Sequence, residues 1–159
     1  MSFQSQTLET LYFQNAAGRL YYQPAAQVVR LACAPERIAV AAIQEYYEQV
    51  LALMLSTGSH KILSCHGQRA PILAAAQEWL TSNWIPRAIA QAGARYCAIV
   101  EGADPLHRLF TQSVVAASPN GLQFQRFAEL GEAPKLARSG KRLVLNVSQL
   151  NCLLRWRPY

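Results

Sequence analysis

Residues 95–105, RYCAIVEGADP, decide the fold that this sequence predicts. The segment from Arg95 to Glu101 is apolar between its charged ends, which is typical of a buried β-strand. Asp104 then offers an N-cap side chain, and Pro105 suits the first turn of a helix. A buried strand followed by a helix is the unit from which an α/β sheet is built.

Two helices and a second strand are predicted before this segment. The first helix opens at Pro35 and Glu36 and ends at Gly58, because glycine suits the residue that follows a helix. Residues 60–65, HKILSC, predict a short strand, and residues 73–92 predict a helix that its internal proline, Pro86, kinks or splits. The apolar face of the first helix consists of Ile43, Tyr47, Val50 and Met54.

A third helix and a last strand are predicted after residue 105. The helix carries apolar residues at helical spacing, and residues 122–127, LQFQRF, alternate as the residues of a strand do. The predicted apolar face of this helix consists of Leu106, Leu109, Phe110, Ser113, Val114 and Ala117.

The N-terminal part predicts a small antiparallel ribbon. Leu11 to Phe13, Arg19 to Tyr22 and Gln27 to Ala32 are β-prone segments separated by turn residues. Residues 9–16, ETLYFQNA, also match the pattern cut by a protease that is used to remove tags. Because this stretch supplies the first strand of the ribbon, we interpret it as part of the fold.

The order of the elements predicts an α/β fold. We expect an open mixed β-sheet with an N-terminal antiparallel hairpin and helices packed on it, in one domain over residues 8–132. Ligand sites in open sheets tend to lie beyond the carboxyl ends of the strands, and the loop after Cys65 is such a place.

Several stretches resemble one protein family. KILSCHGQRAP at residues 61–71, WIPRAIAQAG at residues 84–93 and the strand and helix of residues 95–115 are similar to the STAS / SpoIIAA-like family of small bacterial proteins. The resemblance covers residues 11–132 and implies a single α/β domain, distantly related to CRAL-TRIO lipid-binding domains. The chain lacks the Asp-Ser-Ser-Gly-like stretch that carries the phosphorylated serine of regulatory members. SCHG at residues 64–67 stands where relatives often have an acidic residue and a nearby arginine.

This resemblance implies a protein that acts by binding. The expected function is a non-enzymatic regulatory or protein-interaction module, monomeric or homodimeric, with another protein as its partner. The alternative is a carrier of a small hydrophobic, lipid-like ligand in a pocket between helices and sheet. An interaction module predicts an exposed apolar patch, whereas a carrier predicts an internal cavity lined by helix aromatics.

Five residues form the ligand or partner site that the sequence predicts. Cys65 and His66 end the strand of residues 60–65 and Arg69 follows closely, whereas Trp79 and Trp84 line a pocket or pack two helices together. A cysteine nucleophile needs a base within hydrogen-bond reach. Adjacent residues of a strand point to opposite faces, so we do not expect His66 to activate Cys65, and cysteine chemistry is the less favoured alternative.

No motif indicates a cofactor, a metal or a catalytic centre. The four cysteines form no C-x-x-C pair, the three histidines lack ligand spacing, and no glycine-rich nucleotide loop is present. No apolar run approaches the ~20 residues that span a bilayer, and the N-terminus does not resemble a signal peptide. We therefore expect a cytoplasmic protein that is not inserted in a membrane.

The net charge of +6 comes from the C-terminal end. Residues 1–132 carry nine basic and nine acidic side chains, whereas residues 133–159 carry six basic side chains and no acidic one. Three interpretations of this basic, atypical extension stay open: a strand and helix that complete the domain, a surface for nucleic-acid phosphates or an anionic membrane, and a reading-frame change near Ala133. No specific nucleic-acid partner is expected.

Overall fold

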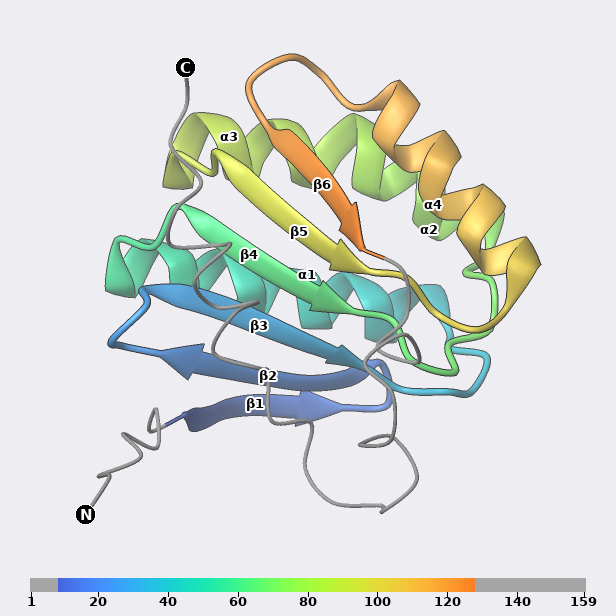
Figure 1. The fold of residues 1–159 in the computed structure, drawn as a ribbon, viewed down its shortest axis with the longest axis horizontal. Coiled ribbons are helices and arrows are strands. Elements are labelled where there is room, and N and C mark those ends of the chain that lie inside the picture. Colours follow the sequence, from blue (N-terminus) through green and yellow to red (C-terminus); the bar gives the residue numbers. More distant parts are fainter. Residues whose placement is uncertain (1–8, 128–159) are drawn as a thin grey trace.

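The computed structural model describes residues 9–127, and the predicted extension at residues 133–159 lies outside them. Six strands form one sheet in which neighbours in the sequence are neighbours in space (Figure 1). They are β1 (Thr10–Asn15), β2 (Gly18–Gln23), β3 (Val28–Cys33), β4 (Lys61–Cys65), β5 (Tyr96–Val100) and β6 (Gln123–Phe127). β1, β2 and β3 pair antiparallel, and β3 to β6 pair parallel. The predicted α/β fold, an open mixed sheet with an N-terminal antiparallel hairpin and helices packed on it, is confirmed.

Helices connect the parallel strands; in Figure 1 those between β3 and β5 pass behind the sheet, and the one between β5 and β6 lies beside β6. Right-handed crossovers between parallel strands whose order never reverses place every connecting helix on the same face. The sheet thus lacks the reversal of strand order beside which ligand sites often open at the strand ends. A ligand site can instead form between the helices and the sheet. The helical elements are α1 (Val40–Thr57), α2 (Ala74–Trp79), the π-helical turn η1 (Leu80–Trp84), α3 (Ile85–Ala92) and α4 (Pro105–Ala117).

Residues 9–16 are an integral part of the sheet. They contain β1, which pairs with β2 over its whole length apart from one register shift. The Asn15 amide donates to the carbonyl oxygen of Ala42 in α1 at 2.9 Å, and Glu9 pairs with Arg30 of β3 at 2.5 Å. The prediction that this stretch supplies the first strand of the ribbon is confirmed.

The first helix begins later than predicted. Pro35 and Glu36 lie in the loop before α1, which starts at Val40, so the predicted opening at Pro35 was wrong. The Pro35 carbonyl accepts a hydrogen bond from the backbone N–H of Ala70, in the loop after β4, instead of starting a helical ladder. The predicted end is confirmed, since Gly58 has φ of 70° and its N–H bonds back into the last turn. The predicted face of Ile43, Tyr47, Val50 and Met54 is buried.

Pro86 divides the helix predicted over residues 73–92, as expected. It stands in the first turn of α3, where its missing N–H is tolerated. The preceding turn, η1, is π-helical: the backbone N–H of Ile85, just after it, bonds to the carbonyl of Leu80, one residue further back than in an α-helix. This turn sets the facing of the two tryptophans: Trp84 is buried at 3% exposure, and Trp79 is only partly buried.

The predicted apolar face of α4 is wrong in part. Leu106 and Leu109 are exposed to 53% and 58%, whereas His107 and Thr111 are the buried residues of the helix. His107 has a polar partner on the sheet side, since its Nε2 lies 3.0 Å from Nδ1 of His66, whereas the Thr111 hydroxyl donates to the carbonyl of His107 in its own helix. The predicted N-cap is confirmed, since the Asp104 carboxylate accepts from the backbone N–H of Leu106 at 2.9 Å.

Buried side chains form two clusters, one on each face of the sheet. The larger cluster lies between the sheet and the helices, and it includes Leu20, Leu31, Ile43, Val50, Met54 and Trp84. The smaller cluster consists of Ala26, Val28, Leu63, Cys65, Ala98 and Val100. The alternation of side chains along β4 and β5 divides their residues between these two clusters.

Candidate ligand-binding cavity

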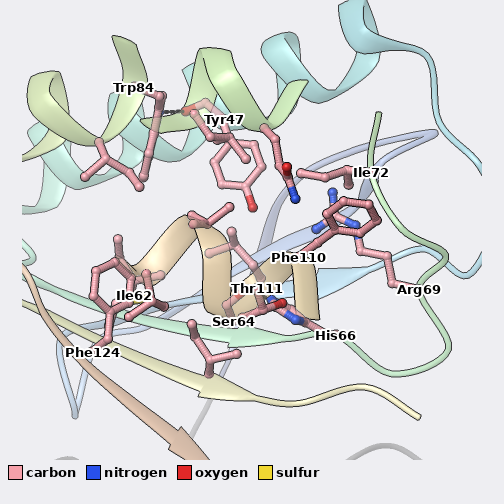
Figure 2. A pocket seen from close by; sticks show the side chains of 18 of the residues that line it. Tyr47, Ile62, Ser64, His66, Arg69, Ile72, Trp84, Phe110, Thr111 and Phe124 are labelled. Carbon is pink, nitrogen blue, oxygen red and sulfur yellow. Dashed lines mark hydrogen bonds between the residues drawn. The ribbon is translucent and has the colours of Figure 1, made fainter. Parts of the chain in front are cut away.

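A cavity of about 80 Å³ lies between the sheet and the helices (Figure 2). This volume is the space open to the centres of water molecules, of which roughly 10–15 Å³ is enough for one water. It therefore has room for several waters or one small organic molecule. Its lining is mostly apolar and includes Leu31, Ile62, Trp84, Ile99, Phe110 and Phe124.

Polar side chains gather at one end of this cavity. Ser64 and His66 come from the end of β4, where the period of two places both on the helix face. His107 and Thr111 come from α4, one turn apart, so both face the sheet. Arg69 lies in the loop that follows β4. Figure 2 shows Ser64, His66, Thr111 and Arg69 toward one side of the cavity, with Trp84 and Phe124 at the other.

Two histidines and a serine form a hydrogen-bonded chain. Nε2 of His66 lies 3.1 Å from Oγ of Ser64, and Nδ1 of His66 lies 3.0 Å from Nε2 of His107. Nδ1 of His107 is buried and has no partner among the described residues. Two proton arrangements satisfy this chain, and in one of them Nδ1 of His107 keeps an unused N–H donor.

Both imidazole rings are neutral at pH 7. Burial, the neighbouring His107 and the charge of Arg69 lower the pKa of His66 to about 3. Burial and Arg69 lower the pKa of His107 to about 4, against a smaller opposing effect of Asp104. The two rings therefore add hydrogen-bonding capacity to the cavity without adding charge.

The order of Ser64, His66 and His107 is that of the nucleophile, base and orienting group of a hydrolase triad. A general base works best when its pKa lies near the working pH. With a pKa of about 3, His66 is a poor proton acceptor, and the third position holds a neutral ring instead of a carboxylate. The arrangement suits hydrogen bonding to a ligand better than proton abstraction.

Among the described residues that line the cavity, Arg69 is the one charged side chain, and it is 3% exposed. One guanidinium nitrogen, Nη1, donates to Sγ of Cys33 at 3.1 Å, and Nε has no partner among the described residues. None of the described ion pairs supplies a carboxylate to this residue. Because a guanidinium stays protonated even when buried, the cavity contains a fixed positive charge with unused donors.

A third unpartnered atom belongs to α2. Nε2 of Gln77 is buried and finds no hydrogen-bond partner within residues 9–127, and Gln77 lines the same cavity. Buried polar groups in folded proteins are nearly always hydrogen-bonded, so single exceptions call for an explanation. Here three of them, on Arg69, Gln77 and His107, border one space.

The structure brings together three of the five residues predicted for the site. His66, Arg69 and Trp84 line the cavity, and the Trp84 indole donates to the backbone carbonyl of Tyr47 at 2.6 Å. Cys65 lies in the cluster on the opposite face of the sheet. Trp79 packs against the edge of the larger cluster and is not part of the cavity lining.

Cys65 is not arranged as a nucleophile. It points away from His66, as strand alternation predicts. Burial raises the pKa of its thiol to about 11, although the charge of Arg30 acts in the opposite direction. Because the reactive form of cysteine is the thiolate, this environment disfavours nucleophilic chemistry at Cys65.

Sequence reasoning missed Ser64, Gln77, His107 and Thr111. Ser64 follows from a simple rule, because it stands two residues before His66 on the same strand and shares its face. For His107 and Thr111 on α4, the available signal was two polar residues four positions apart within an apolar helix pattern. Nothing in the sequence marks Gln77.

Comparison with known proteins identifies no relative. No protein-family model matches the chain, and neither a curated protein nor a solved structure matches it. The resemblance to STAS / SpoIIAA-like proteins therefore stays a prediction. Across residues 9–127, none of the helices is long and apolar enough to cross a membrane.

Proposed function

We propose that this chain is a cytoplasmic, non-enzymatic protein that binds a small, largely apolar molecule in the cavity between its helices and its sheet. The observation that carries this proposal is an apolar cavity bordered at one end by buried polar atoms without partners. An apolar body with a few convergent polar groups is the usual make-up of a small-molecule site. The missing partners of these atoms are expected to come from a ligand.

The size of the cavity limits the ligand. At about 80 Å³ it is well below the roughly 300–1,000 Å³ that is common for sites of drug-sized ligands. A molecule with one aromatic ring or a short alkyl chain fits this space better than a lipid with long acyl chains. The carrier alternative is therefore proposed for a small molecule only.

Native mass spectrometry of the protein as purified from cells tests the proposal first. We expect a reproducible extra mass that disappears when the protein is denatured, because a buried ligand is released on unfolding. A protein that carries no extra mass, and that takes up none of a panel of small apolar compounds at millimolar concentration, would contradict the proposal.

A cavity-filling variant connects any bound mass to this site. Val114 lines the cavity from α4, so Val114→Phe is expected to occupy the space and prevent uptake of the ligand. Ser113→Phe places the same side chain on the exposed part of the same helix and serves as the matched control. Loss of the extra mass in both variants, or in neither, would argue against binding in this cavity.

One further observation favours a second candidate, a regulatory interaction module of STAS-like type. Leu106 and Leu109 are exposed one turn apart at the start of α4, on the side that faces away from the sheet. For this candidate we propose a second copy of the chain as the partner. Analytical ultracentrifugation is then expected to show a dimer that the Leu106→Lys/Leu109→Lys variant abolishes. A wild-type chain that stays monomeric at high micromolar concentration would rule this partner out.

A further inference from the structure

We propose that the ligand of the cavity is a small monocarboxylic acid, and that Arg69 binds its carboxylate. This inference rests on the proposed function, because it names the chemical class of a molecule held in the same cavity. It starts from the position of Arg69, whose side chain reaches back from the loop after β4 toward the cavity, past Ile72 and Phe110 (Figure 2).

The charge of Arg69 is buried and unbalanced. A guanidinium at 3% exposure has lost nearly all of its contact with water, and no described carboxylate replaces that contact. Buried charges in proteins are as a rule paired. Its described side-chain partners are both uncharged: Sγ of Cys33, which is a weak acceptor, and the phenol of Tyr47. An anion is the partner that fits such a group.

The remaining donors favour a carboxylate over a phosphate. Arg69 has Nε without a partner, and one edge of a guanidinium can hold both oxygens of a carboxylate in parallel. Gln77 offers a further unused N–H donor through Nε2. Since His66 and His107 are neutral at pH 7, the cavity supplies one positive charge, which matches a monoanion. A phosphate dianion would leave one negative charge buried and unbalanced.

The rest of the cavity selects the remainder of the ligand. Beyond the polar end the lining is apolar, with Trp84 and Phe124 farthest from Arg69 in Figure 2. A ligand with its carboxylate at Arg69 therefore places its other end among aromatic and aliphatic side chains. Small aryl or short-chain alkyl carboxylic acids have this make-up.

Pairs of acids and their amides test the inference, because each pair differs in charge but hardly in shape. We would titrate ligand-free protein with phenylacetate and phenylacetamide, benzoate and benzamide, and hexanoate and hexanamide, and measure binding by calorimetry at pH 7. For at least one pair the acid is expected to bind more than about tenfold tighter than the amide, which is the range of a charge-assisted hydrogen bond. Phenyl phosphate is expected to bind more weakly than the best acid.

Arginine variants assign the preference to this residue. Arg69→Met is expected to remove the preference for the acid while binding of the amide changes less than threefold. Arg69→Lys keeps the charge but not the two-point contact, so it is expected to keep part of the preference. Arg95→Met removes an exposed arginine outside the cavity and is expected to change neither affinity.

The outcomes separate this inference from the proposed function. If acids and amides bind equally well, the cavity binds small molecules but Arg69 does not select an anion, and the inference is wrong. The same holds if the preference survives in Arg69→Met or if phenyl phosphate binds more tightly than every acid. If no member of any pair binds at millimolar concentration, both the inference and the proposed function are contradicted.

Discussion

The two faces of the central sheet are built from the same strands, yet they differ in chemistry. On β4, Ile62 and Ser64 line the cavity beneath the helices, whereas Leu63 and Cys65 belong to the cluster on the opposite face. The cavity face combines apolar side chains with buried polar atoms that lack partners, and the other face contains a tightly buried apolar cluster. One strand thus contributes to a candidate site on one side and to stability on the other.

This difference indicates that the cavity face, and not the opposite face, retains unfavourable free-energy contributions that are useful for binding. An apolar cluster gains from every buried methylene, whereas an unpaired buried polar group costs about 1–3 kcal/mol. Groups of the second kind are concentrated at the cavity, on Arg69, Gln77 and His107. Sites of function commonly retain such local costs, so replacing these residues should affect stability differently from replacing residues of the opposite face.

The largest effect is expected for truncation on the apolar face. Leu63 is 2% exposed, and Leu63→Ala should lower the free energy of unfolding by about 2–5 kcal/mol, because it removes buried methylene groups and leaves a void. The adjacent Ser64→Ala loses one hydrogen bond to His66 and should cost only about 1 kcal/mol. Urea unfolding of both variants measures the difference. Equal losses would mean that the two faces do not differ in the way proposed.

The next largest effect is a dependence of stability on pH that arises from the cavity face. The pKa values of His66 and His107 are lowered in the folded state to about 3 and about 4, from an ordinary value near 6.5. The unfolded chain therefore binds protons at these residues below pH 6.5, while the folded chain does not. Stability is full above that pH and falls as the pH is lowered toward 4, by up to about 2 kcal/mol per histidine between pH 7 and pH 5.

Histidine variants assign this pH dependence. In His66→Gln/His107→Gln the loss of unfolding free energy between pH 7 and pH 5, followed by urea titration, should be much smaller than in the wild type. His60→Gln, which changes an exposed histidine, should keep the full loss. A wild-type stability that is flat over this range would show that the two rings are not buried in neutral form.

A smaller effect, of opposite sign, is expected at Arg69. Arg69→Met removes a buried charge that has no described carboxylate partner, so it should raise the free energy of unfolding of the ligand-free protein by about 1–3 kcal/mol. Thermal and urea unfolding measure this gain. A clear loss of stability would instead mean that Arg69 is needed to hold the loop after β4 in place.

The sequence was sufficient to predict the order of the elements and the face of the sheet to which strand side chains point. Alternation and turn residues predicted β1 to β6, and the caps at Asp104 and Gly58 predicted helix ends, because these signals are local. The start of α1 was wrong because the Pro35 carbonyl is used by Ala70, a contact between segments far apart in the chain. Local signals do not contain such contacts.

The candidate site was predicted only in part for a related reason. His66 and Arg69 lie next to a strand end, which is a recognisable position, but they pair with residues of other elements, such as His107 of α4 and Cys33 of β3. The inward face of α4 was misread because apolar spacing was expected to mark it, whereas His107 and Thr111 are the buried residues. His107 points inward and pairs with His66 of another element, and such a contact depends on tertiary packing.

The finest test of the comparison uses two buried thiols on opposite faces. Cys97 lines the cavity and Cys65 does not, while burial raises the pKa of both, to about 12 and about 11. In variants that keep only one of these cysteines, with serine at the other cysteine positions, both thiols should react slowly with methyl methanethiosulfonate at pH 8 because little thiolate is present.

A bound ligand should slow the modification of Cys97 severalfold, since it occupies the space next to that thiol, and leave the rate at Cys65 unchanged. Equal protection of both thiols would indicate that the ligand acts by stabilising the whole fold, and protection of Cys65 alone would place it on the other face of the sheet.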